Sequence, residues 1–219
     1  MNIRLPFADR TAAAHLLARA LDEYRGYRPL VLALPRGGVP IGQIVARELG
    51  GDLDMVQARK IGAPSNPELA IGAVAENGWR FVFDSTADMD ISAAQIDALA
   101  ERELALMRER RVAWVQGRVP PEVRGRLVLV VDDGIATGAT MIAAIESLLP
   151  QKPERLICAT PIASRDCLSR LREITHDLVY LAAPEDFRAV GQYYIDFRPV
   201  EDVEVKAMLA PFAISGKSG

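Results

Sequence analysis

Short, uninterrupted hydrophobic runs recur along this chain and alternate with segments of helical periodicity. Continuous aliphatic strands separated by helices are typical of a parallel sheet that is covered on both faces. The pattern therefore predicts a doubly wound α/β fold with a mainly parallel sheet. The predicted strands are residues 29–34, 53–58, 126–131, 155–160 and 177–182, and the predicted helices are 9–24, 41–49, 140–149 and 164–174.

Two segments interrupt this alternation. Residues 60–84 are rich in Gly, Pro and Asn and predict a mobile loop, whereas 88–118 predict a helical insert. Within the insert, Ser92 and Gln95 form a capping-box pattern at the start of a long helix over 92–116. Its arginine-rich end, RERRVAW, suits a solvated face, a homodimer contact or a phosphate contact. With a C-terminal hood over 184–219, we expect a single domain over 1–219.

Composition narrows the class of protein. The formal net charge is −3 and the pI is about 5.5, which disfavours nucleic acid as the main partner because that role calls for a basic face. Two cysteines form no disulfide framework. The N-terminus lacks the apolar core of a signal peptide, and no apolar run approaches the roughly 18 residues of a membrane span. We expect a cytoplasmic protein that contacts no membrane.

Three glycine-containing loops follow predicted strands, at the sheet edge where α/β proteins bind ligands. In PRGGVPIG, Gly37 and Gly38 permit close approach of the backbone to a ligand, and Arg36 offers donors for phosphate. A tight turn with a surface arginine is the alternative. After the second strand, Arg59 and Lys60 could meet another phosphate or could simply be solvated.

The third loop lies in VVDDGIATGAT, residues 130–140. Asp132 and Asp133 end the strand, where carboxylates can accept hydrogen bonds from vicinal hydroxyls. The backbone amides beyond them open a helix, whose N-terminus favours an anion. Neither a Walker A nor a GxGxxG motif is present. A phosphate beside a diol describes ribose 5-phosphate, and the candidate phosphate-binding residues are Ile135, Ala136, Thr137, Gly138, Ala139 and Thr140.

These motifs resemble those of the type I phosphoribosyltransferase family. VVDDGIATGAT is similar to the family's signature for 5-phosphoribosyl-1-pyrophosphate (PRPP), and PRGGVP is similar to its pyrophosphate loop. RKIG resembles the start of the mobile catalytic loop of adenine transferases, and AENG (75–78) falls where they carry an acid-x-Gly. In relatives the pyrophosphate loop contains a non-proline cis peptide, which the resemblance places at Arg36–Gly37.

The resemblance implies transfer of phosphoribose from PRPP, with Mg²⁺, to a nucleobase-like acceptor, and release of pyrophosphate. Asp132 and Asp133 would hold the ribose hydroxyls or waters on the metal, with Asp196 near it. The residues expected to meet pyrophosphate are Arg36, Gly37, Gly38, Arg59 and Lys60, the last also being a catalytic candidate together with the two aspartates.

Two departures from the family pattern affect the expected mechanism. Ala136 stands where 6-oxopurine transferases carry a general base, so the resemblance moves that role to Glu76 in the mobile loop, with Glu68 as the second candidate. Gly134 replaces a larger residue. EDFRAVGQYYIDF (185–197) resembles the base-reading hood of hypoxanthine-type enzymes, or is an aromatic segment of the core; its candidate base-binding residues are Phe187, Val190 and Tyr193.

The acceptor base stays open at this point. An alternative function on the same fold is a regulatory protein that senses PRPP or a nucleotide without turnover.

Overall fold

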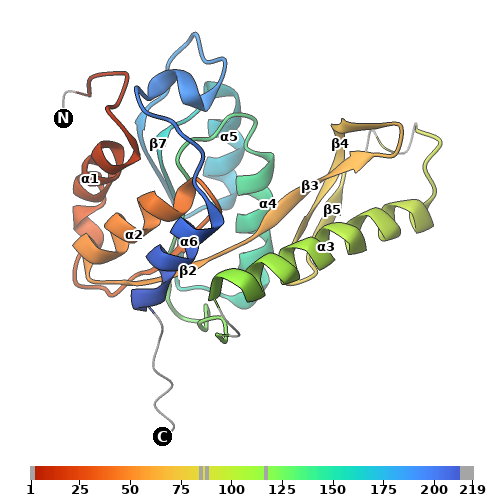
Figure 1. The fold of residues 1–219 in the computed structure, drawn as a ribbon, viewed down its shortest axis with the longest axis horizontal. Coiled ribbons are helices and arrows are strands. Elements are labelled where there is room, and N and C mark those ends of the chain that lie inside the picture. The colour runs from red at the N-terminus through yellow and green to blue at the C-terminus, as the bar shows by residue number, and fades with distance from the viewer. Residues whose placement is uncertain (1–2, 84–85, 87–88, 116–117, 213–219) are drawn as a thin grey trace, which may run out of the picture.

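A five-stranded parallel sheet forms the centre of the protein (Figure 1). The computed structural model describes residues 3–83, 86, 89–115 and 118–212. β1 and β6 are uninterrupted hydrophobic runs that are buried along their whole length, and the parallel sheet confirms the predicted fold class. In spatial order they are β2 (Asp52–Met55), β1 (Leu30–Ala33), β6 (Leu127–Val131), β7 (Arg155–Ile162) and β8 (Asp177–Ala182).

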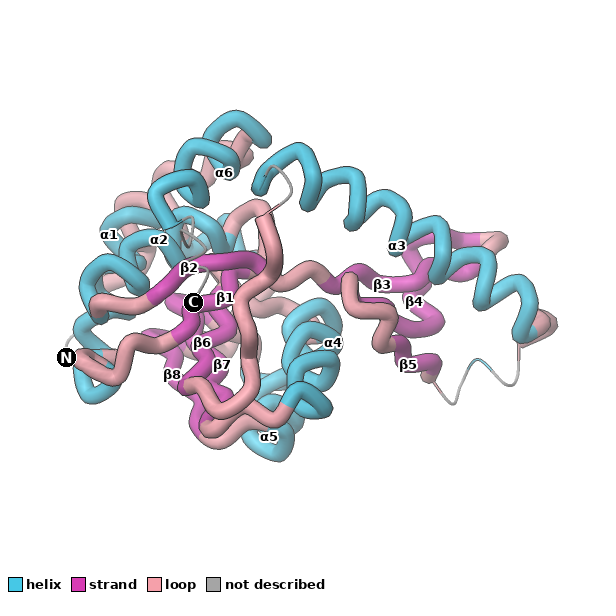
Figure 2. The backbone as a smooth tube through the Cα atoms, turned by 90° about the horizontal axis from the view of Figure 1, so that it is seen from below, coloured by secondary structure: helices cyan, strands magenta, loops and turns pink. Residues whose placement is uncertain are grey.

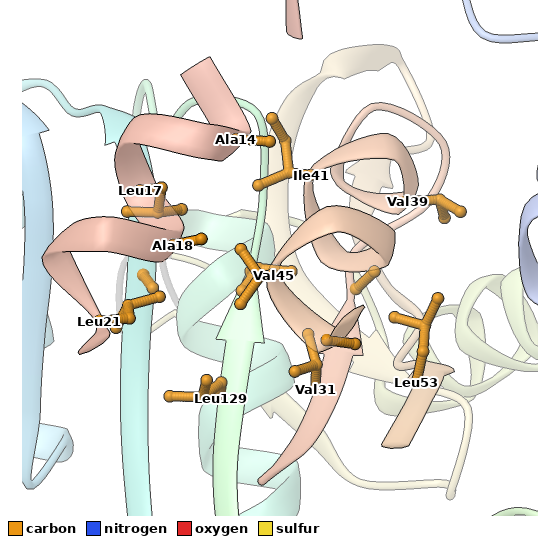
Figure 3. Packing of buried hydrophobic residues seen from close by; sticks show 14 of the residues in the cluster. Ala14, Leu17, Ala18, Leu21, Val31, Val39, Ile41, Val45, Leu53 and Leu129 are labelled. Carbon is orange, nitrogen blue, oxygen red and sulfur yellow. The ribbon is translucent and has the colours of Figure 1, made fainter. Parts of the chain in front are cut away.

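Helices cover both faces of this sheet (Figure 2). α1 (Arg10–Ala20) and α2 (Gly38–Leu49) pack on one face, while α4 (Ala139–Leu148) and α5 (Arg165–Ile174) pack on the other. Aliphatic side chains such as Leu17, Val45 and Leu129 interdigitate between α1, α2 and the strands (Figure 3). Short 3₁₀ turns occupy Asp22–Tyr24, Leu149–Gln151, Val190–Tyr193 and Ala210–Phe212.

The segment that follows β2 is an arm built on a second, antiparallel sheet, not the predicted loop. We use "arm" for β3 (Ala58–Ala63), β4 (Asn66–Ala75), β5 (Arg80–Val82) and α3 (Ala93–Val115). One face of the small sheet packs against α3 through a core that includes Ile61, Ile71 and Met107. This core stabilises the strands, although the Gly and Pro content of the segment predicts a loop. The expected strand 53–58 is in fact two strands: its first part belongs to β2 of the central sheet, and Ala58 begins β3 of the small sheet.

The start of α3 agrees with the prediction. The Ser92 amide donates to Gln95 Oε1 over 2.9 Å, and the Gln95 amide donates to Ser92 Oγ over 3.3 Å. This reciprocal pair is the expected capping box. The predicted insert and loop also include residues 84–85, 87–88 and 116–117, which lie outside the described residues.

The C-terminal segment crosses the top of the α1–α2 face and ends in α6 (Asp202–Leu209), which packs against α2 and α3. We use "hood" for residues 184–212 of this segment; 213–219 lie outside the described part. Phe7 forms an isolated parallel bridge with Tyr194, so the hood is joined to the chain just before α1. Within the described residues, no helix has the length and apolar character needed to cross a membrane.

Candidate phosphoribose-binding site

The candidate site lies where the sheet order reverses. β1 and β6 are neighbours, but the chain leaves β1 for α2 on one face and leaves β6 for α4 on the other. In open α/β sheets such a switch point leaves a crevice outside the carboxyl ends of the two strands. The two loops that resemble the PRPP motifs begin at these strand ends.

These two loops touch each other directly. A Cβ atom on Gly37 would lie 2.1 Å from Asp133 Oδ2, and one on Gly38 would lie 2.7 Å from the Val131 carbonyl oxygen. No side chain fits at either position without displacing the second loop. The glycine pair therefore serves first to bring the backbone of the first loop against the acids, which leaves its peptide groups beside them.

Arg36 does not contribute its side chain to this contact. Its guanidinium pairs with Asp202 at 3.5 Å and with Glu201 at 3.9 Å, at the start of α6, and 43% of the side chain is exposed. The non-proline cis peptide joins Pro35 to Arg36, one bond before the expected Arg36–Gly37. The structure thus corrects both the position of that bond and the surroundings of the arginine.

Asp132 and Asp133 lie side by side at the end of β6, where Asp133 is buried and Asp132 is partly buried. The Asp133 amide donates to Asp132 Oδ1 over 2.8 Å. Burial raises the pKa of both carboxyls above the usual range, and the neighbouring Asp133 raises that of Asp132 further. Two desolvated acids of this kind gain from a cation or from hydroxyl donors, because either compensates their charge.

One cation is already present at this pair and was not identified from the sequence. Arg10 Nε donates to Asp133 Oδ2 over 2.7 Å, with only 12% and 11% of the two side chains exposed. The guanidinium opposes the effect of burial on the pKa of Asp133. Since 123 residues separate the partners and Arg10 belongs to none of the motifs, no local pattern could have indicated the contact.

The loop before α4 has the features of an anion site. Gly138, the N-cap residue, adopts a left-handed conformation with φ of 80° and offers no side-chain cap, while the Ala139 amide donates to Thr137 Oγ1 over 3.5 Å. Within the described residues, no backbone carbonyl accepts from the amides of Ala136, Thr137, Gly138 or Thr140. Free amides at a helix N-terminus favour an anion. The side chains of Thr137 and Thr140 are exposed beside them, and Ala139 begins the helix.

Ile135 has a different role from the one expected. Its amide donates to the Ile162 carbonyl over 2.9 Å, and its carbonyl accepts from the Ser164 amide over 2.8 Å. The amide is therefore unavailable to a phosphate. Ile135 fixes the start of the loop to the end of β7, so the anion-binding amides begin one residue later.

Arg59 and Lys60 belong to the arm. Arg59 pairs with Glu103 of α3, and Lys60 is exposed on the same strand. Both line a pocket of about 330 Å³ between β3 and α3 that includes none of residues 132–140. The structure therefore does not bring them together with the two aspartates, although the sequence places all four after strands.

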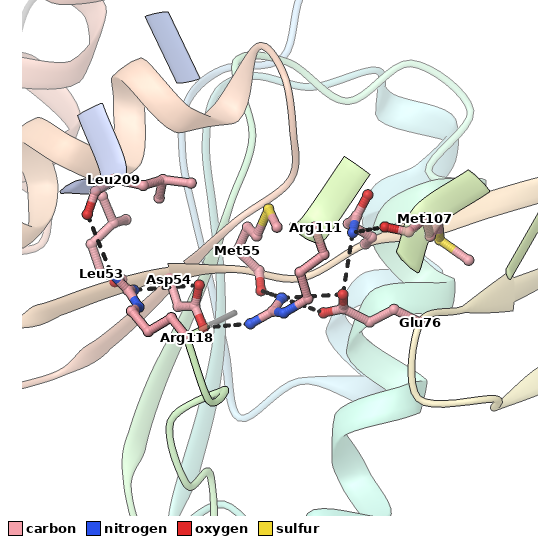
Figure 4. Close-up of polar contacts among 9 residues, drawn as sticks. Leu53, Asp54, Met55, Glu76, Met107, Arg111, Arg118 and Leu209 are labelled. Atoms are coloured by element: carbon pink, nitrogen blue, oxygen red, sulfur yellow. Dashed lines mark hydrogen bonds and ion pairs between the residues drawn. The ribbon is translucent and has the colours of Figure 1, made fainter. Parts of the chain in front are cut away.

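Glu76 also lies away from the aspartates, and its expected role as base stays a prediction. Arg111 Nη1 donates to its two carboxylate oxygens over 3.0 and 3.1 Å, and Gln57 Nε2 donates over 3.3 Å (Figure 4). Burial raises the pKa of Glu76, and Arg111 acts in the opposite direction. The carboxylate is engaged in an internal ion-pair network and also lines a cavity of about 430 Å³.

The neighbouring residue shows how far Glu76 is from the loop. Asn77 Nδ2 donates to the carbonyl of Ser147, near the end of α4. At 1.5 Å per residue this point lies about 12 Å along the helix from its start at Ala139. The backbone of the second base candidate, Glu68, lies in β4, and its side chain is outside the described part of the structure.

The hood residues expected to bind a base mainly attach the hood to the core. Tyr193 is 6% exposed, and its ring centroid lies 5.5 Å from that of Phe187. A Cβ on Gly134 would lie 2.3 Å from Val190 Cγ1. Gly134, the mild departure from the family pattern, is therefore the residue that lets the hood pack onto the end of β6. Tyr193 fits the alternative of an aromatic core segment.

The carboxylates near the end of β6 can be compared with the ligands that Mg²⁺ requires. Mg²⁺ is usually held by one or two carboxylates together with waters and phosphates of the ligand. Asp132 and Asp133 supply such a pair of adjacent oxygen donors. Asp196 is exposed and accepts from the Arg198 amide over 3.1 Å; among the described residues no three Asp, Glu, His or Cys side chains are grouped as a metal site. The two aspartates fit the ion, and Asp196 is not grouped with them.

Comparison with known proteins agrees with this geometry. The phosphoribosyl transferase domain model matches residues 9–198, so the chain belongs to that family. A relative from Mycobacterium tuberculosis, "Putative phosphoribosyl transferase MT0597", is 39% identical over 204 residues, which is 93% of this chain. The chain spans 46% of the length of that relative.

Two solved structures have a similar fold. The protein TT1426 from Thermus thermophilus is 42% identical, with a TM-score of 0.83 and coverage of 95% of this chain and 100% of its own. A protein from Neisseria gonorrhoeae is 13% identical with a TM-score of 0.50, over 96% of this chain and 98% of its own; that likeness concerns the fold alone.

Proposed function

We propose that this protein transfers 5-phosphoribose from PRPP to a nitrogen of a base-like acceptor and releases pyrophosphate, acting in the cytoplasm. The observation that carries the proposal is the contact of the Gly37–Gly38 backbone with Asp133, next to the uncapped start of α4. A 5-phosphate, a ribose diol and a diphosphate have matching partners in that order along one crevice. Family membership supports the same activity.

Each part of the crevice has its own task in this reaction. The amides from Ala136 to Thr140 would hold the 5-phosphate, and the carboxylates of Asp132 and Asp133 would accept from the ribose hydroxyls. The peptide groups at Gly37 and Gly38 would face the pyrophosphate. Mg²⁺, held by the two aspartates and the ligand, would supply charge neutralisation of the diphosphate.

The reaction exchanges one bond at C1 of the ribose. The bond from C1 to the pyrophosphate oxygen breaks, the bond from the acceptor nitrogen to C1 forms, and pyrophosphate leaves with the bonding electron pair. The proton on the acceptor nitrogen passes to solvent water. Alignment of the two partners and preorganised polar groups around the leaving group are the contributions expected of the protein. The acceptor must lie on the face of C1 opposite the pyrophosphate.

The position of Glu76 favours a second candidate function. Ala136 supplies no base in the signature, and the Glu76 carboxylate is tied to Arg111, so neither of these two positions offers an unpaired carboxylate. A regulatory protein that binds PRPP or a nucleotide without turnover requires the crevice but no base. Both functions require binding of PRPP, and only the transferase then passes the phosphoribose to an acceptor.

A turnover screen separates the two candidates. Pyrophosphate release is measured with PRPP, Mg²⁺ and a panel of purines, pyrimidines and simple amines, and PRPP binding is measured in parallel by calorimetry. Release that depends on one acceptor supports the transferase. Binding of PRPP without release for any acceptor supports the sensor, and absence of PRPP binding refutes both.

A further inference from the structure

Arg10, the first residue of α1, contacts both Asp133 and the hood. Its Nε donates to Asp133 Oδ2 over 2.7 Å, and its Nη1 donates to the Arg198 carbonyl over 2.8 Å. Its guanidinium carbon lies 3.9 Å from the centroid of the Phe197 ring. A single planar side chain therefore joins the acid of the crevice to both the backbone and an aromatic ring of the hood.

The hood in turn contacts Asp133 a second time. The Phe197 ring is stacked on Tyr194, with centroids 5.0 Å apart and an angle of 24° between the planes. Tyr194 donates from its hydroxyl to the Asp133 carbonyl over 2.6 Å. Asp133 is thus held at its carboxyl by Arg10 and at its carbonyl by Tyr194, and Phe197 lies against both of these partners.

The position of Arg10 is itself fixed by local structure. Asp9 caps α1, with Oδ1 accepting from the Ala12 amide over 2.7 Å. Just before it, the Phe7 amide donates to the Tyr193 carbonyl and the Phe7 carbonyl accepts from Ile195, each over 2.8 Å. The chain leading to Arg10 is therefore attached to the hood on one side and to a capped helix on the other.

We infer that Arg10 is a positioning residue of the phosphoribose site, holding the Asp133 carboxyl in the orientation that accepts the ribose hydroxyls and making that orientation depend on the hood. The inference rests on the proposed function, because it assumes that Asp133 meets the ribose. Lysine cannot replace arginine in this role. An ammonium keeps the charge but lacks the planar fork that reaches Asp133 and Arg198 together while it lies on an aromatic ring.

The test compares Arg10→Lys with a matched control, Arg126→Lys. Arg126 likewise pairs with an aspartate, Asp52, at 2.7 Å and donates to a backbone carbonyl over 3.0 Å, but it precedes β6 at the opposite edge of the sheet. Calorimetry measures binding of PRPP, ribose 5-phosphate and inorganic phosphate to both variants. Inorganic phosphate requires only the start of α4, whereas the two sugar phosphates also require Asp133.

We expect Arg10→Lys to weaken binding of both sugar phosphates about tenfold, the loss typical of a hydrogen bond to a charged group, and to leave inorganic phosphate binding unchanged. Arg126→Lys should leave all three unchanged. Wild-type affinity for ribose 5-phosphate in Arg10→Lys, or an equal loss for inorganic phosphate, would overturn the inference. If the wild-type protein binds neither sugar phosphate, the proposed function itself fails.

A second variant covers the case in which Arg10→Lys melts at a lower temperature than the control. Phe197→Leu keeps the guanidinium and the carboxylate and removes the ring that lies against Arg10 and Tyr194. The same selective loss of sugar phosphate binding, smaller in size, supports a positioning role. Unchanged sugar phosphate binding in a folded Phe197→Leu protein contradicts the dependence on the hood.

Discussion

Replacing Arg111 by methionine should destabilise the protein without weakening the phosphoribose site. Arg111 comes from α3 and joins the root of the arm to the central sheet. Its Nη2 pairs with Asp54 of β2 at 2.7 Å while its Nη1 donates to Glu76 and, over 3.3 Å, to the Met55 carbonyl (Figure 4). Methionine keeps much of the length of the side chain and removes its charge.

The size of the effect follows from burial. Asp54 is 1% exposed and Glu76 is 20% exposed, so the substitution leaves two poorly solvated carboxylates. Removing one partner of a buried ion pair costs about 3–5 kcal/mol. Arg118 Nη2 remains 3.5 Å from Asp54, which favours the lower end of that range. A loss of about 3 kcal/mol corresponds to roughly 10 °C in melting temperature for a chain of this size.

Chemical denaturation measures this loss, with Arg170→Met as the control. Arg170 pairs with Glu146 at 2.7 Å but is 53% exposed, so its removal should cost less than about 1 kcal/mol. Adding Glu76→Gln to Arg111→Met should recover about 1 kcal/mol, because it removes an unpaired charge. Equal stability of the Arg111→Met and Arg170→Met proteins would refute the assigned network, and a loss of PRPP affinity in Arg111→Met would return Glu76 to the site.

Two further predictions concern packing around the site. Gly134→Ala places a methyl carbon 2.3 Å from Val190, so denaturation should show a loss of about 1–3 kcal/mol; wild-type stability would contradict the packing of the hood onto this glycine. Burial raises the pKa of the Cys158 thiol, so this thiol should react with iodoacetamide at pH 8 far more slowly in the native protein than in denaturant, and equal rates would contradict its burial.

The central sheet could be predicted because most of its strands are contiguous, largely hydrophobic segments. β1 and β6 are buried on both faces, so consecutive residues such as Leu129 and Val130 are all hydrophobic. The arm is different, because its strands contain Gly62 and Pro67 and lack an uninterrupted run of large aliphatic residues. Their stability comes from α3 and α4, which pack on them from more distant parts of the chain.

The candidate site could be predicted only where it consists of contiguous loops. Gly37 and Asp133 belong to recognisable motifs, and the parallel topology brings the motifs together. Arg10 and Glu76 show the limit of this reasoning. Arg10 reaches Asp133 from a helix outside every motif, whereas Glu76 has the expected order along the chain but is held at the far end of α4 by its partners. The order of the motifs along the chain carried no information about the distance between Glu76 and the two aspartates.

The most direct test of the account is calorimetry of PRPP binding, in the presence of Mg²⁺, to the wild-type protein and to the double variant Asp132→Asn with Asp133→Asn. Asparagine keeps the size of each side chain and removes the charge that accepts from the ribose hydroxyls and attracts the ion. The account predicts clear binding to the wild-type protein and no measurable binding to a folded double variant. Undiminished affinity in the double variant would contradict the assignment of this crevice as the PRPP site.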